Sequence, residues 1–160
     1  MEQKQTIRNL NTALQMEITA THQYQLHAQV LDDWGLPGLA EMMRQEQAEE
    51  TEHSDRFLDR ILFLGGEPEV AFEKAPVRAT SLREMFEADL KDEENAIRFY
   101  TKAAKEAGAE GDIGSRLLFE QIVLDEEGHK AWLETQLDLI ERLGEAVYAV
   151  RFLGASGAEG

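Results

Sequence analysis

The sequence predicts an all-α protein: a four-helix bundle with a long crossover between its second and third helices and a short C-terminal fifth helix. Glycine and proline gather in a few clusters, and apolar residues recur at helical spacing in the long segments between them. No segment shows the alternation of a strand. We expect long helices over about 6–34, 38–64, 82–107 and 113–143.

Local signals place several helix ends. Ser81-Leu82-Arg83-Glu84 matches a capping box, Asp112 can cap the fourth helix, and Pro37 suits a first turn. The 15 residues of 66–80 span about 50 Å when extended, whereas a 27-residue helix is about 40 Å long. The crossover can therefore return along the bundle, which makes the second and third helices parallel.

Length and composition bound the class of protein. We expect one domain over 1–160, with the bundle at about 6–143, the short fifth helix at about 145–153 and a flexible tail at 154–160. The chain has 16 basic and 32 acidic residues, a net charge of −16, which argues against nucleic acid and membrane surfaces as partners. It contains no cysteine, so a metal would need His, Asp or Glu ligands. With no long apolar run and no signal peptide at Met1–Gln5, we expect a cytoplasmic protein.

An internal repeat carries the candidate chemistry. An offset of 76 places Glu17 on Glu93 (93 − 17), Glu50 on Glu126 (126 − 50) and His53 on His129 (129 − 53). Apolar positions repeat at the same offset, which predicts two helix pairs related by a pseudo-twofold axis. In each helix these polar residues interrupt the apolar stripe, so all six should converge in the core.

Four ionised carboxylates buried together need a positive partner, because each loses hydration and repels the others. No Lys or Arg occupies a neighbouring stripe position, whereas two divalent cations would balance four negative charges. Carboxylate oxygen with imidazole nitrogen favours iron or manganese over calcium or magnesium. One Glu from each of two helices plus Glu-x-x-His from each of two others is typical of di-metal carboxylate bundles.

The chain resembles the bacterioferritin family over nearly its whole length. Besides the six residues, Asp33-Trp34-Gly35-Leu36, Arg60-Ile61-Leu62-Phe63-Leu64 and Asp125-Glu126-Glu127-Gly128-His129 carry the resemblance. It implies the ferritin-like fold and a homo-oligomeric hollow cage of twenty-four subunits that stores and detoxifies iron. Each subunit would be a ferroxidase with two iron ions, oxidising Fe(II) with dioxygen or hydrogen peroxide.

The resemblance also implies roles for single residues. Glu17 and Glu93 would be terminal ligands, Glu50 and Glu126 bridging ligands, and His53 and His129 would give one imidazole to each iron. Tyr24 matches the family's tyrosine near the site, a possible electron donor. The repeat places Tyr100 in the same relation to Glu93 as Tyr24 has to Glu17, which offers a second donor.

Two positions depart from the family pattern. Thr51 stands where the family has its haem-ligating methionine, and a hydroxyl is a poor axial ligand, so we expect little or no haem b. Gln45 replaces the family's inner-surface histidine, which leaves Glu49 and Asp125 as oxygen ligands there. The sequence therefore resembles a haem-free subunit, in a cage of its own or one shared with a haem-binding sister subunit.

Two other functions fit the same ligand pattern. A small di-iron peroxidase of the rubrerythrin type would need another electron source, because the chain has no cysteine for a thiolate iron domain. A DNA-protecting mini-ferritin often uses a basic tail, whereas Met1–Gln5 contains a single Lys.

Overall fold

The computed structural model describes residues 4–154, and these contain helices and no strand. The long helices are α1 (Gln5–Asp33), α2 (Pro37–Phe63), α3 (Leu82–Ala109) and α4 (Ile113–Leu143). The predicted all-α four-helix fold is confirmed, with helix ends within two residues of the expected positions. The fifth helix is shorter than predicted: α5 covers Glu145–Ala149, and a 3-10 turn, η1, covers Val150–Phe152. The tail predicted at 154–160 lies outside the described residues, apart from Gly154.

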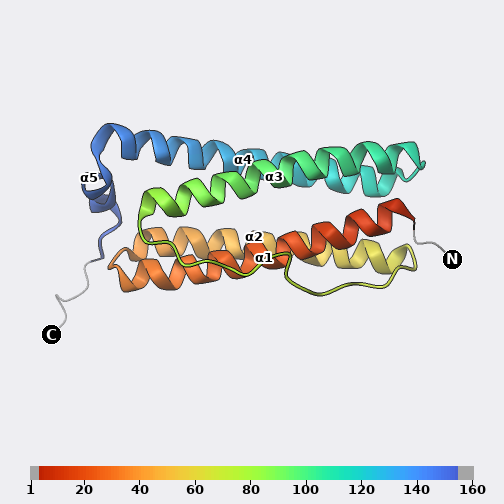
Figure 1. Ribbon diagram of the computed structural model, residues 1–160, viewed down its shortest axis with the longest axis horizontal. Coiled ribbons are helices and arrows are strands. Elements are labelled where there is room, and N and C mark those ends of the chain that lie inside the picture. The colour runs from red at the N-terminus through yellow and green to blue at the C-terminus, as the bar shows by residue number, and fades with distance from the viewer. Residues whose placement is uncertain (1–3, 155–160) are drawn as a thin grey trace.

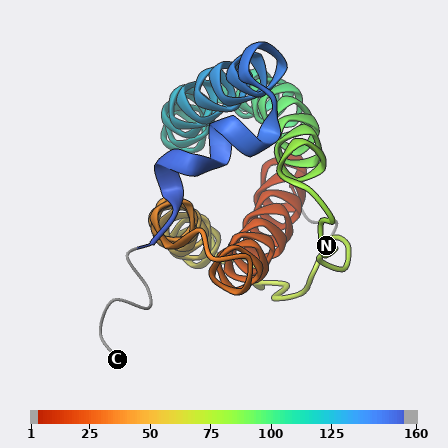
Figure 2. The same ribbon diagram turned by 90° about the vertical axis from the view of Figure 1, so that its left-hand side faces the viewer.

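The helices form two antiparallel pairs, α1 with α2 and α3 with α4 (Figure 1). The crossover runs back along α1, so that α2 and α3 are parallel, as predicted. Seen end-on, α5 and η1 cross one end of the bundle from α4 toward α2 (Figure 2). Within residues 4–154, no helix combines the length and the apolar character that a membrane span requires.

Polar side chains of α1 hold the crossover in place. They lie at every fourth position of one helical face: Asn11, Gln15, Thr19 and Gln23. Three backbone N–H groups of the crossover, those of Glu69, Glu73 and Val77, donate to Asn11, Thr19 and Gln23 at 2.8, 2.9 and 2.9 Å. These bonds give an irregular segment the backbone partners that it cannot supply itself. We call this row of four residues the α1 ladder.

The capping predictions hold in part. The Ser81 hydroxyl accepts from the Glu84 N–H at 3.1 Å, and Asp112 accepts from the Ser115 N–H at 2.9 Å. A capping box has a second bond, from the Ser81 backbone N–H to the Glu84 carboxylate. Here that carboxylate accepts from the Thr80 hydroxyl, so only the bond to the Ser81 hydroxyl forms. Pro37 is in the first turn of α2, as predicted.

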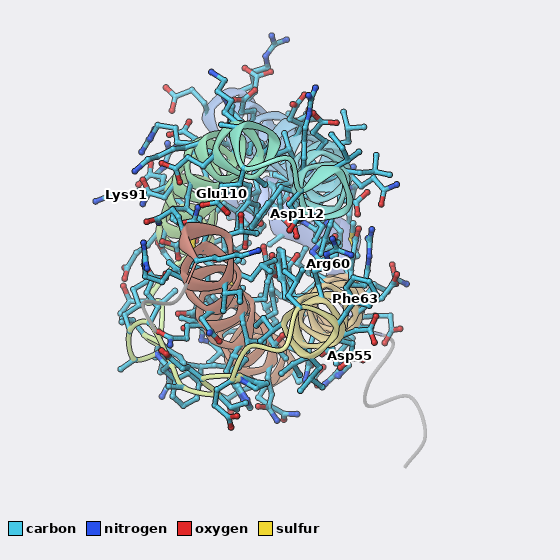
Figure 3. All side chains as sticks on the ribbon, turned by 90° about the vertical axis from the view of Figure 1, so that its right-hand side faces the viewer. Asp55, Arg60, Phe63, Lys91, Glu110 and Asp112 are labelled. Carbon is cyan, nitrogen blue, oxygen red and sulfur yellow. The ribbon has the colours of Figure 1, made fainter. Side chains whose placement is uncertain are left out.

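Side chains also join the helix pairs at the end of the bundle opposite α5 (Figure 3). The guanidinium of Arg60 on α2 donates to Asp112 at 2.5 Å and to the Ser115 hydroxyl at 2.9 Å. The Thr6 hydroxyl of α1 donates to Glu110, after α3, at 2.6 Å. A Cβ at position 114 would lie 2.5 Å from Arg60 Nη2, so glycine there allows the arginine to reach α4.

The interior has two apolar clusters, one toward each end of the bundle. Leu39, Met43 and Phe86 belong to the cluster under α5, and Leu14 and Phe57 to the other. Burying such side chains supplies most of the driving force for packing the helices. The six polar residues of the repeat lie between the two clusters.

Candidate metal centre

All six predicted residues meet in the middle of the bundle. Glu17 comes from α1, Glu50 and His53 from α2, Glu93 from α3, and Glu126 and His129 from α4. The four carboxylates and His53 are 1–4% exposed, and the side chain of His129 is 10% exposed. The helical stripes therefore identify the inward face of every long helix correctly.

The six residues form two overlapping groups. The first contains Glu17, Glu50, His53 and Glu126, and the second contains Glu50, Glu93, Glu126 and His129. Within each group, one ligand-type atom from every residue lies within 4.8 Å of the others. Because Glu50 and Glu126 belong to both groups, the geometry suits two adjacent cations that share these two carboxylates.

Both imidazoles turn their Nδ1 atoms toward the shared carboxylates. His53 Nδ1 lies 3.1 Å from Glu126 Oε1, and His129 Nδ1 lies 3.5 Å from Glu50 Oε1. On the far side of each ring, Nε2 faces a carboxylate, that of Asp125 for His53 at 3.0 Å and that of Glu49 for His129 at 2.7 Å. When Nε2 carries the proton, Nδ1 is left as the lone-pair donor that a metal needs.

These outer carboxylates, Glu49 and Asp125, are also related by the offset of 76, since 125 − 49 is 76. The sequence analysis gave Glu49 and Asp125 a role only as oxygen ligands on the inner surface. In the structure they hold the rings of His129 and His53. The shared offset was the signal that could have paired each of them with a histidine.

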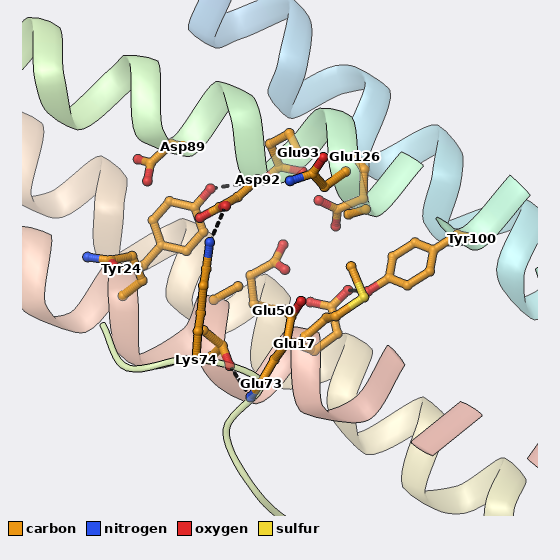
Figure 4. A pocket seen from close by; sticks show the side chains of 16 residues that line it. Glu17, Tyr24, Glu50, Glu73, Lys74, Asp89, Asp92, Glu93, Tyr100 and Glu126 are labelled. Carbon is orange, nitrogen blue, oxygen red and sulfur yellow. Dashed lines mark hydrogen bonds and ion pairs between the residues drawn. The ribbon is translucent and has the colours of Figure 1, made fainter. Parts of the chain in front are cut away.

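The two tyrosines bond the terminal carboxylates crosswise (Figure 4). The Tyr24 hydroxyl of α1 donates to Glu93 Oε1 on α3 at 3.0 Å, and the Tyr100 hydroxyl of α3 donates to Glu17 Oε1 on α1 at 2.7 Å. Tyr24 was singled out for its spacing from Glu17 on its own helix, but its bonded partner is on the facing helix. Burial, followed by the nearby carboxylates, raises the pKa of both phenols.

Without cations the centre retains protons. Burial raises the pKa of Glu50 and of Glu93 well above 4.5, and neighbouring carboxylates, chiefly Glu17 for Glu50 and Glu126 for Glu93, add to the rise. Burial opposes the charge of His53, but interactions with Glu126 and Glu17 outweigh it and raise its pKa to about 11. The pKa of His129 is raised for the same kind of reason, through Glu126, Glu46 and Glu93. Positive charge is therefore what the site lacks.

The unsatisfied atoms test whether metal ions fit. Each of the six residues has one buried atom with no hydrogen-bond partner among the described residues: Glu17 Oε2, Glu50 Oε1, His53 Nδ1, Glu93 Oε2, Glu126 Oε1 and His129 Nδ1. Buried polar atoms are rarely left unpaired, because each costs about 1–3 kcal/mol. Six such oxygen and nitrogen atoms around one centre fit the donor set expected of a pair of iron ions.

A buried pair of hydrogen-bonded side chains lies beside one half of the centre and breaks the repeat. His27 Nε2 is 2.8 Å from Asp89 Oδ1, and both side chains are almost fully buried. The offset of 76 places Ala103 on His27 and Ala13 on Asp89. Sequence reasoning did not identify His27 as a member of this pair, nor its partner Asp89. Its position four residues before Glu93, on the same helical face, was the available signal.

A narrow cavity of about 60 Å³ lies between α1 and α3 above the carboxylates. The crossover covers it, and the Lys74 ammonium lies 2.5 Å from Asp92 Oδ1 on α3 (Figure 4). Glu73, Asp89 and Glu93 also line the cavity. The Lys74–Asp92 ion pair therefore lies on the same face of the bundle as this cavity.

Comparisons with known proteins agree with this arrangement. The ferritin family, defined by its ferritin-like domain, matches residues 7–143. Bacterioferritin of Rhodobacter capsulatus is 41% identical over 145 residues, covering 90% of this chain and 89% of its own length. Bacterioferritin of Streptomyces coelicolor is 42% identical over 144 residues, covering 90% and 86%. The chain belongs to the bacterioferritin family.

Solved structures agree with the sequence relatives. Rhodobacter capsulatus bacterioferritin, described with a metal-free dinuclear site and haem iron, superposes with a TM-score of 0.93 at 38% identity and covers 99% of each chain. Mycobacterium tuberculosis bacterioferritin BfrA gives a TM-score of 0.91 at 37% identity, covering 96% of this chain and 98% of that one. The predicted family and its iron-storage function are confirmed.

Proposed function

We propose that the protein is a ferroxidase: it oxidises Fe(II) at the six-residue centre and passes the ferric product to a mineral stored in a protein cage. Family membership supports the storage role. The observation that carries the oxidation step is the pair of overlapping ligand groups with Glu50 and Glu126 in common. Such a centre holds two iron ions side by side, so that both can give an electron to one oxidant.

Each residue has a distinct task in this proposal. Glu50 and Glu126 would be shared by the two iron ions, and Glu17 and Glu93 would each bind one of them. His53 and His129 add one neutral nitrogen to each ion, with Asp125 and Glu49 fixing the orientation of the rings. Four carboxylates balance the charge of two Fe(II) ions, which removes the repulsion that raises the pKa of Glu50 and Glu93.

The oxidant determines how many electrons are needed. Two Fe(II) ions supply two electrons, which reduce one hydrogen peroxide to water. Dioxygen taken to water needs four, so a nearby phenol becomes useful as a further source. Tyr24 is the first candidate donor, because its hydroxyl is hydrogen-bonded directly to Glu93.

We also propose that the assembled protein is a homo-oligomeric cage of twenty-four subunits with little or no haem b. The Thr51 hydroxyl donates to the backbone carbonyl of Gln47 at 2.8 Å and offers no sulfur ligand. Thr51→Met is expected to increase haem uptake, measured by the Soret absorbance of protein reconstituted with haem. An unchanged Soret band would mean that the surrounding pocket does not accept haem.

The ferroxidase proposal is tested by mixing metal-free protein with Fe(II) and dioxygen and following ferric absorbance, with native mass measurement of the assembly. Rapid oxidation, two iron ions per subunit at saturation and a cage-sized mass are expected. A small oligomer would favour the peroxidase alternative, and a salt-dependent shift of DNA mobility would favour the DNA-protecting one. Slow oxidation, equal to that in buffer, would contradict the proposal.

A further inference from the structure

We propose that Tyr100 is a second electron donor of the centre, so that each of its halves has its own redox-active phenol. This inference rests on the proposed ferroxidase function. Tyr24 alone brings the electrons available for one dioxygen to three, which is one fewer than full reduction requires. Tyr100 supplies the fourth.

The position of Tyr100 mirrors that of Tyr24. Its hydroxyl donates to Glu17 at 2.7 Å, which is shorter than the 3.0 Å bond from Tyr24 to Glu93. Both acceptors are carboxylates of the centre, one in each overlapping ligand group. An electron leaving either phenol therefore crosses one hydrogen bond and one carboxylate to reach the site where Fe(II) binds.

The surroundings of Tyr100 suit an oxidised phenol. Its side chain is fully buried, and its ring packs 5.7 Å from Phe57 and 6.0 Å from Phe119, centroid to centroid. This wall comes from α2 and α4, and Phe99 of α3 adds a third ring at 6.0 Å. This packing encloses the ring within the bundle, while the Glu17 carboxylate is placed to receive the phenolic proton.

The step balances in atoms and electrons. Two Fe(II) become two Fe(III), two phenols become two phenoxyl radicals, and one dioxygen takes up the four electrons. The phenols release two protons along their hydrogen bonds, two further protons are taken up from the solution, and two water molecules form. Two further Fe(II) ions then reduce the radicals, and each phenol regains a proton from water, so no other reductant is required.

Radical yield tests the proposal, because it differs from oxidation rate as a readout. Metal-free protein is mixed with Fe(II) and dioxygen, frozen rapidly and examined by electron paramagnetic resonance, with peroxide release measured in parallel. A tyrosyl signal should remain in Tyr24→Phe and in Tyr100→Phe, and it should be lost in the double variant. Each single variant should release more peroxide than the parent. Loss of all tyrosyl signal in Tyr24→Phe alone would overturn the proposal.

A matched control is available, because the chain has three tyrosines. Tyr148 is also buried, and its hydroxyl donates to Gln136 at 2.6 Å, within the cluster under α5. Tyr148→Phe should therefore leave radical and peroxide yields unchanged. Tyr100→Phe keeps the ring packing, and anaerobic binding of two Co(II) per subunit will show that its site is intact.

A purely positioning role for Tyr100 predicts a different result. Tyr100→Phe would then alter the Co(II) spectrum, while Tyr24→Phe would carry no radical, which contradicts the proposal and leaves the ferroxidase function in place. Failure of the parent protein itself to oxidise Fe(II) rapidly would instead contradict the proposed function.

Discussion

The two halves of the centre, which correspond to the two overlapping groups, contain the same types of residue but differ in what surrounds them. Glu17, His53 and Tyr100 in one half correspond to Glu93, His129 and Tyr24 in the other, and the set in each half is drawn from three helices. Each imidazole is backed by a carboxylate and each terminal glutamate by a phenol. The repeat therefore extends beyond the ligands to the groups that orient them.

The difference begins one layer further out. The half with Glu93 has the buried His27–Asp89 pair nearby, and Glu46 lies 2.6 Å from His129 Nε2. In the other half, the positions equivalent to His27 and Asp89 are alanines, and the position equivalent to Glu46 is Ile122. The half with Glu93 is thus polar and the half with Glu17 is apolar. The residue types of the candidate ligands are common to both halves, whereas the electrostatic surroundings are particular to each, so the two ligand groups are similar but not equivalent.

The largest effect is expected from substituting either glutamate that the two halves share. Glu50→Ala or Glu126→Ala should abolish binding of both metal ions and rapid Fe(II) oxidation, because either glutamate belongs to both ligand groups. Anaerobic Co(II) titration and stopped-flow oxidation measure the two losses. Glu127→Ala is the matched control, since Glu127 neighbours Glu126 but is exposed. An unchanged initial rate in Glu50→Ala would contradict the assignment.

A smaller effect is expected from substituting a glutamate that belongs to one half alone. Glu17→Ala or Glu93→Ala should each remove one of two bound Co(II) ions, because each residue belongs to a single ligand group. Spectroscopic titration gives the stoichiometry, and the ion that remains should have a different spectrum in the two variants. Identical spectra would show that the polar layer around Glu93 does not distinguish the metal positions.

The next effect concerns the pair that breaks the repeat. His27→Ala should destabilise the metal-free protein by about 1–3 kcal/mol, because it leaves the buried Asp89 side chain without its hydrogen-bond partner. The double variant His27→Ala/Asp89→Ala reproduces the alanine pair of the other half and should recover part of that loss. Denaturant unfolding followed by circular dichroism measures both. A double variant no more stable than His27→Ala alone would contradict this account.

The smallest effect is a dependence on pH. The raised pKa values of Glu50 and Glu93 mean that the folded metal-free protein binds more protons than the unfolded chain at pH values above 4.5. Its stability should therefore fall as the pH rises above this value, whereas the lowered pKa of Glu126 changes the stability only around and below pH 4.5. Melting temperatures of metal-free protein at about pH 5 and about pH 8 measure the change. Metal affinity should rise over the same range, since binding displaces those protons.

Sequence reasoning predicted the fold and the convergence of the six buried residues for a common physical reason. Helical periodicity fixes which face of each helix is buried, and Glu17, Glu50, Glu93 and Glu126 lie on that face. The offset of 76 then indicates that the four faces meet at one level of the bundle. Both arguments use only positions along single helices, which the sequence contains in full.

Contacts between helices were harder to predict. The donation from Tyr24 to Glu93, and the pairing of His27 with Asp89, depend on the rotation and axial shift of α3 against α1. Periodicity does not determine these two quantities. The α1 ladder was not predicted for a related reason. Asn11 and Gln23 bond to the backbone of an irregular segment, and the sequence of such a segment has no periodicity from which its path could be predicted.

The α1 ladder also bears on the order in which the chain is synthesised. A ribosome releases α1 before the crossover, so the side chains of Asn11, Thr19 and Gln23 are in place when Glu69, Glu73 and Val77 emerge. In the folded protein these three bonds hold the segment along α1, with the start of α3 at the end of the bundle where α2 begins. The first helix, which is synthesised before the crossover, therefore carries the side chains that hold the crossover in the path required for the parallel arrangement of α2 and α3.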